Sequence, residues 1–147
     1  MKNMRIAAAL FLNGILSVAP AAAKPPQVLP DQMFSNLYAL TQASSILTIC
    51  KESDAWPALP DRQKQLLQRL QGNIDGLVRK IGRKFDNDVF GFYARERDSA
   101  SRDPEFIRQA AAQYGYCGDA MFERMQWYVY DSQQKLDLFL TELPDAK

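Results

Sequence analysis

The residues of this chain with the clearest chemistry are its two cysteines, Cys50 and Cys117. They follow an N-terminus with the pattern of a secretory signal, which directs a chain to an oxidising compartment where two thiols form a disulfide. The alternative is a redox-active pair, but such pairs use the Cys-x-x-Cys spacing, which lowers the pKa of one thiol. The sequence therefore predicts a structural disulfide that closes a loop of about 67 residues.

A second feature is that the chain contains no histidine. Without histidine there is no Ser-His-Asp or Cys-His catalytic set, no histidine-ligated haem and few ways to hold zinc. Paired carboxylates can still meet in space, but no spacing in the sequence points to such a pair. We therefore predict no enzymatic activity, no catalytic residue, no cofactor and no metal.

Residues 1–23 have the three parts of a signal peptide. Lys2 and Arg5 supply the positive start, residues 6–18 are mostly apolar, and a run of small residues ends at Ala23. We expect signal peptidase to cut after Ala23. The alternative is a retained membrane anchor, but the apolar stretch is shorter than the ~20 residues that span a bilayer.

The mature chain then starts at Lys24, continues through a flexible segment over 24–30 and forms a single domain over 31–147. Its net charge falls from +1 to −1 when Lys2 and Arg5 are removed, and a charge near zero argues against nucleic-acid binding. We predict a periplasmic or secreted protein whose oligomeric state the sequence leaves open.

Apolar residues recur at helical spacing, and no stretch alternates as a half-buried strand does. The one β-like piece, Val89 to Tyr93, is short, and we expect residues 95–102 to form a charged connection. The segment from Gln32 to Cys50 has no charged residue, which is typical of a helix at the centre of a domain. The sequence predicts an all-α, antiparallel bundle of about four helices with one disulfide. The predicted helices cover 31–53, 61–88, 103–115 and 119–143.

Four basic residues lie close together near the end of the second predicted helix: Arg79, Lys80, Arg83 and Lys84. They could bind an anionic partner, such as lipid headgroups, a polyanion or an acidic protein surface. The alternative, which we favour, is a solvated helix face balanced by the last helix, which has six acids against two basic residues between 119 and 145. Contact with a membrane surface is therefore not the preferred interpretation.

Aromatic residues are frequent in the second half of the chain. Core packing is the preferred interpretation of most of them, because aromatics fill the cores of small bundles. Trp127 and Tyr130, however, fall off the main apolar stripe of the last helix, so we expect at least one of them at the surface. Exposed Trp and Tyr side chains are typical of partner-binding surfaces.

The segment Asp86-Asn87-Asp88 has the alternating polar residues that can start a calcium loop. The next ligand position is Phe90 and the closing position is Arg97, so the motif is incomplete. We predict a local cap or turn at this place instead of a metal site.

No residue pattern identifies a family. In helix order and cysteine placement the chain resembles small exported helical proteins with one disulfide, among them secretion-system pilotins and the immunity proteins that neutralise peptidoglycan-cutting effectors. It lacks the lipid-attachment cysteine of pilotins, and no functional residue carries over from either group. The leading hypothesis is a non-catalytic binding or adaptor module for another protein in the periplasm. The alternatives are a carrier that holds an apolar ligand between helices and a peripheral membrane protein that uses the basic second helix.

Overall fold

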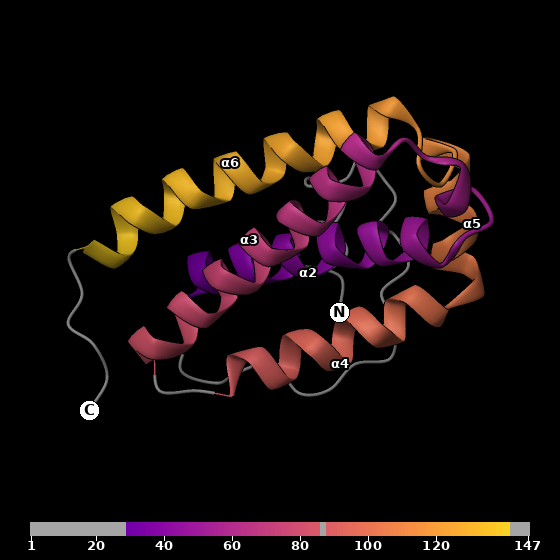
Figure 1. Cartoon of the computed structure of the whole chain (residues 1–147). Coiled ribbons are helices and arrows are strands. Elements are labelled where there is room, and N and C mark those ends of the chain that lie inside the picture. Colours follow the sequence, from indigo (N-terminus) through magenta and orange to yellow (C-terminus); the bar gives the residue numbers. More distant parts are fainter. Residues whose placement is uncertain (1–28, 86–87, 142–147) are drawn as a thin grey trace.

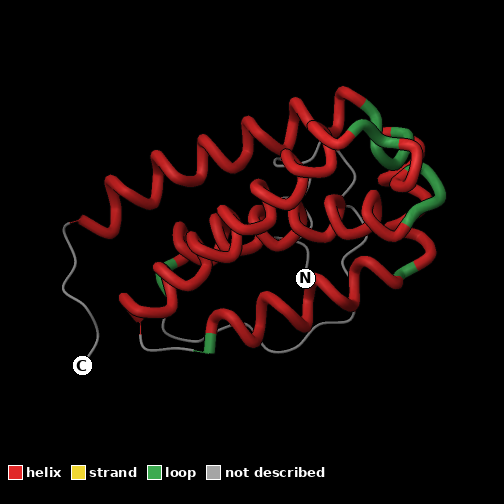
Figure 2. Tube along the Cα trace, viewed as in Figure 1, coloured by secondary structure: helices red, strands yellow, loops and turns green. Residues whose placement is uncertain are grey.

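The computed structural model describes residues 29–85 and 88–141, so the signal peptide and its cleavage site lie outside the described residues. The described chain is all-α, as predicted, and Figure 2 shows helices and loops in it but no strand. It contains five α-helices where about four were expected, together with a short 3-10 turn, η2 (Trp56–Ala58). The helices are α2 (Asp31–Glu52), α3 (Asp61–Phe85), α4 (Val89–Arg102), α5 (Pro104–Tyr114) and α6 (Asp119–Thr141).

α4 is the main correction to the expected fold. The second predicted helix was expected to reach Asp88, but α3 ends at Phe85, and Val89–Arg102 is a helix and not a β-like piece followed by a charged connection. Asp88 caps α4, because its Oδ1 accepts a hydrogen bond from the amide of Gly91 at 3.0 Å. The buried residues of α4 keep a helical spacing, but one of them is the charged Glu96. That residue interrupts the apolar pattern on which the prediction relied.

α2 lies at the centre of the bundle, as its lack of charge predicted (Figure 1). It contacts α3, α4, α5 and α6, and residues on every side of it are buried. The buried hydroxyls of Thr41 and Ser45 donate hydrogen bonds to carbonyl oxygens one turn earlier, at 2.7 Å to Leu37 and 2.8 Å to Thr41. Within residues 29–85 and 88–141, no helix combines the length and the apolar character that crossing a bilayer requires.

The helices of the bundle are not all antiparallel. Figure 1 shows α2 and α4 running in one direction and α3 and α6 in the other. The side chains of Gln63 and Asp119 meet at 3.2 Å near the start of α3 and α6, and those of Lys80 and Asp137 meet at 3.2 Å near their ends. The antiparallel prediction is therefore correct for α2 with α3 and wrong for α3 with α6, which pack side by side and parallel.

Candidate functional site

The disulfide joins the last turn of α2 to the turn that precedes α6. The Sγ atoms of Cys50 and Cys117 lie 2.07 Å apart, which confirms the predicted pairing, and both side chains are buried. Gly115 turns the chain here with a φ of 58°, in the left-handed region, and a Cβ at Gly118 would lie 2.5 Å from the Tyr114 carbonyl oxygen. Burial keeps the sulfur atoms from thiols in solution, which favours a structural role.

The basic cluster predicted on the second helix is divided among different contacts. The Arg79 guanidinium carbon lies 3.9 Å from the centre of the Phe90 ring, and Lys80 pairs with Asp137 across to α6. Arg83 is exposed, whereas Lys84 is half-buried and is not free of contacts. The Lys80 pair agrees with the interpretation that acids of the last helix balance this face. The four residues do not form one free cationic patch.

Trp127 and Tyr130 are both exposed, with 54% and 64% of their surface accessible, so the expectation that at least one lies at the surface is confirmed. Leu138, which the sequence analysis did not single out, is 78% exposed. At about 100° per residue, the three side chains fall within about 80° of one another on α6. We call them the α6 outer face. The eight-residue spacing from Tyr130 to Leu138 was the signal that could have identified this third member.

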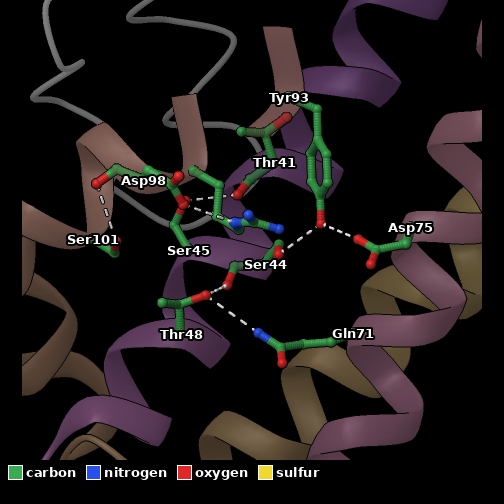
Figure 3. Close-up of polar contacts among 10 residues, drawn as sticks. Thr41, Ser44, Ser45, Thr48, Gln71, Asp75, Tyr93, Asp98 and Ser101 are labelled. Atoms are coloured by element: carbon green, nitrogen blue, oxygen red, sulfur yellow. Dashed lines mark hydrogen bonds and ion pairs between the residues drawn. The ribbon is translucent and has the colours of Figure 1, made fainter. Parts of the chain in front are cut away.

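A polar cluster, buried at Ser44 and Tyr93 and half-buried at its other members, joins α2, α3 and α4 near the middle of the bundle (Figure 3). The Tyr93 hydroxyl lies 2.7 Å from Asp75 Oδ1 and 2.8 Å from Ser44 Oγ. Because a carboxylate only accepts, the single phenolic proton goes to Asp75 and the Ser44 hydroxyl donates to Tyr93. One turn further along α2, Gln71 Nε2 donates to Thr48 Oγ1 at 3.2 Å. These contacts couple α3 and α4 to the central helix.

The phenols around this cluster are neutral at physiological pH. Burial raises the pKa of Tyr93 well above its usual value, and burial together with the nearby Glu96 carboxylate raises the pKa of Tyr38 to about 12. Solvent does not reach the Ser44 and Tyr93 side chains. In the described arrangement these hydroxyls therefore make contacts within the chain and are not accessible to a substrate. The signal for this cluster in the sequence is weak: hydroxyl residues stand at 41, 44, 45 and 48 within the uncharged segment 32–50.

The described surface includes two open grooves. The larger, of about 720 Å³, lies between the first half of α3 and α6, and the smaller, of about 370 Å³, lies beside the disulfide. Both grooves are wide open to solvent, whereas a carrier site encloses most of the surface of its ligand. Neither groove therefore supports the carrier hypothesis. The larger groove is lined by Pro60, Arg62, Gln63, Gln65, Leu66, Arg69 and Gln126.

The region considered as a calcium loop is only partly described. Asp86 and Asn87 lie outside the described residues, and Asp88 is the cap of α4, in agreement with the predicted cap or turn. In the part of the chain that the structure describes, no three His, Cys, Asp or Glu side chains are grouped so that they could hold a metal ion.

On α6, the large side chains of Trp127, Tyr130 and Leu138 are exposed to solvent, whereas the Ser44 and Tyr93 side chains of the polar cluster are buried. No known protein family, no curated protein and no solved structure matches this chain.

Proposed function

We propose that this chain is an exported, non-catalytic module that binds another protein chain through the α6 outer face. The observation that supports the proposal is the exposure of Trp127, Tyr130 and Leu138 on one side of a single helix. Covering large apolar side chains with a partner removes their surface from water, which favours association. Trp and Tyr are also the residues that most often contribute binding energy at interfaces.

The scaffold is suited to this role. The disulfide ties the end of α2 to the start of α6, and the Lys80–Asp137 pair ties α6 to α3 near its other end. A helix joined to the disulfide and packed on the core through residues such as Met125 and Leu136 presents its outer side chains with little loss of conformational entropy on binding. The periplasmic or secreted location is part of the proposal and rests on the signal sequence and the disulfide.

Site-specific photocrosslinking tests the proposal. A photoreactive amino acid is placed at Trp127 or Tyr130 in the exporting cell, and at Arg102 on α4 as the control. Arg102 is exposed and belongs to a helix on the other side of α2 from α6 (Figure 1). We expect crosslinked species that contain a second protein chain from positions 127 and 130 and not from 102. Equal crosslinking at all three positions, or none at 127 and 130, contradicts the proposal.

A further inference from the structure

α3 and α6 present one continuous surface to solvent. On α3, the residues Arg69, Gly72, Gly76 and Lys80 fall within an arc of about 80°, at about 100° per residue. Lys80 reaches Asp137 on α6 at 3.2 Å, so this arc borders the α6 outer face. The two helices lie side by side and run in the same direction (Figure 1). We call the combined surface the α3–α6 face.

Two exposed positions on the α3 part of this face carry no side chain. Gly72 and Gly76 are exposed, and a Cβ at either position would have no atom within 4 Å. A glycine inside a helix lowers stability by up to about 1 kcal/mol relative to alanine. Packing within the described chain therefore gives no reason for either glycine. A large side chain from outside can approach the helix backbone closely at this place.

The register of the two helices places Tyr130 at the height of these two glycines. The two cross-helix pairs, Gln63 with Asp119 and Lys80 with Asp137, have sequence separations of 56 and 57 residues. The helices thus keep nearly the same register over this length, since each rises about 1.5 Å per residue. Tyr130 is consequently level with the residues between Gly72 and Gly76.

The two helices that form the face carry opposite net charges. α3 carries seven basic and two acidic residues, whereas α6 carries four acidic and two basic residues over its described length. Two copies can meet face to face about a two-fold axis that runs either along the helices or across them. An axis across the helices would place α3 on α3, with like charges facing. An axis along them places α3 of one copy on α6 of the other, with opposite charges facing.

We infer that the α3–α6 face pairs two copies of the chain about a two-fold axis parallel to these helices. The inference deepens the proposed function and rests on it, since it names the partner of the α6 outer face. Rotation about such an axis preserves height along it. The partner's Tyr130 therefore packs over Gly72 and Gly76, and the partner's Glu123 comes within about 4 Å of Arg69 along the axis.

Charge exchange at Arg69 and Glu123 tests this geometry. Arg69→Glu alone places two glutamates together at both symmetric contacts, and Glu123→Arg alone places two arginines together. We expect sedimentation equilibrium of the purified mature protein to show a dimer for the native sequence. Each single variant should dissociate at least about tenfold more readily, because two like-charge contacts replace two attractive ones.

Mixing the two variants gives the decisive result. In the mixed dimer one contact joins the introduced glutamate of one chain to the introduced arginine of the other, and the second contact is native. Equal amounts of the two variants should therefore restore the dimer. Because neither single chain changes on mixing, altered contacts within a chain cannot produce this recovery. Arg102→Glu on α4 is the matched control and should leave the native dimer unchanged.

Three results would overturn the inference. The first is a native protein that is monomeric at about 0.1 mM, a concentration at which even a weak specific dimer forms. The others are single variants that remain dimeric and an equal mixture of the two variants that remains monomeric. Circular dichroism of each variant verifies that it is folded. If the protein is monomeric but crosslinks at Tyr130 contain a different protein, the inference fails and the proposed function stands. If no protein crosslinks there, both fail.

Discussion

At the scale of single residues, two buried tyrosines of α2 and α4 differ in one respect. The Tyr93 hydroxyl lies 2.7 Å from Asp75 and 2.8 Å from Ser44, whereas the buried Tyr38 hydroxyl has no hydrogen-bond partner among the described residues. Tyr93→Phe removes one member of this network and leaves the buried Ser44 hydroxyl and the half-buried Asp75 carboxylate without that partner. We expect the free energy of unfolding to fall by about 1–3 kcal/mol in urea denaturation.

Tyr38→Phe is the matched control, because it makes the same chemical change at a position with 4% exposure. Its hydroxyl gains nothing from the fold, so its removal should leave the free energy of unfolding unchanged or slightly higher. The midpoint of urea denaturation, measured for both variants with an unchanged slope, gives the comparison. Equal losses in the two variants would mean that the polar cluster contributes no net stability.

At the scale of elements, replacing Gly76 or Gly118 by alanine should change the free energy of unfolding in opposite directions. A Cβ at Gly76 meets nothing within 4 Å, so Gly76→Ala should raise the free energy of unfolding of the monomer by up to about 1 kcal/mol. A Cβ at Gly118 would lie 2.5 Å from the backbone carbonyl oxygen of Tyr114, so Gly118→Ala should lower it. Thermal denaturation at low protein concentration checks both, and a fall for Gly76→Ala would indicate an intrachain role that the described contacts do not contain.

The sequence predicted the elements whose apolar residues repeat without interruption. α2 and α3 were both expected from apolar residues that recur at helical spacing, and the uncharged segment 32–50 indicated that α2 is central. α4 was missed because Glu96 occupies a buried position and Gly91 stands in its first turn, so neither composition nor periodicity indicated a helix. The parallel arrangement of α3 and α6 could not be predicted, since α4 and α5 lie between them in the chain and set their relative direction.

The candidate site, like the fold, could be predicted only in part from the sequence. The exposure of Trp127 and Tyr130 followed from their positions on one helix, which periodicity alone can place. The contact between Tyr93 and Asp75 could not be predicted, because it depends on how α3 and α4 pack on α2. The open space at Gly72 and Gly76 likewise becomes evident only when the neighbours of each Cβ position are known.

At the scale of the whole molecule, the disulfide connects parts of the bundle that are distant in sequence. Cys50 lies in the last turn of the central helix, and Cys117 precedes α6, 67 residues later. The intact mass of the exported protein, measured without reductant, should be two hydrogens below that of the dithiol chain starting at Lys24. Two titratable thiols in the folded protein would contradict the structural assignment.

The replacement of both cysteines by serine measures what this connection contributes. A crosslink that closes a loop of 67 residues reduces the entropy of the unfolded chain. In the chain-entropy model this is worth roughly 4 kcal/mol, so Cys50→Ser with Cys117→Ser should lower the free energy of unfolding by up to that amount. The native protein, denatured with and without reductant, is the control and should show a similar difference.

The helices are packed by the core and not by the disulfide, so the folded variant should keep its helical circular dichroism. A variant with an unchanged free energy of unfolding would show that the disulfide contributes no stability. A variant that loses its helical circular dichroism would show that the core cannot keep α6 packed without the disulfide.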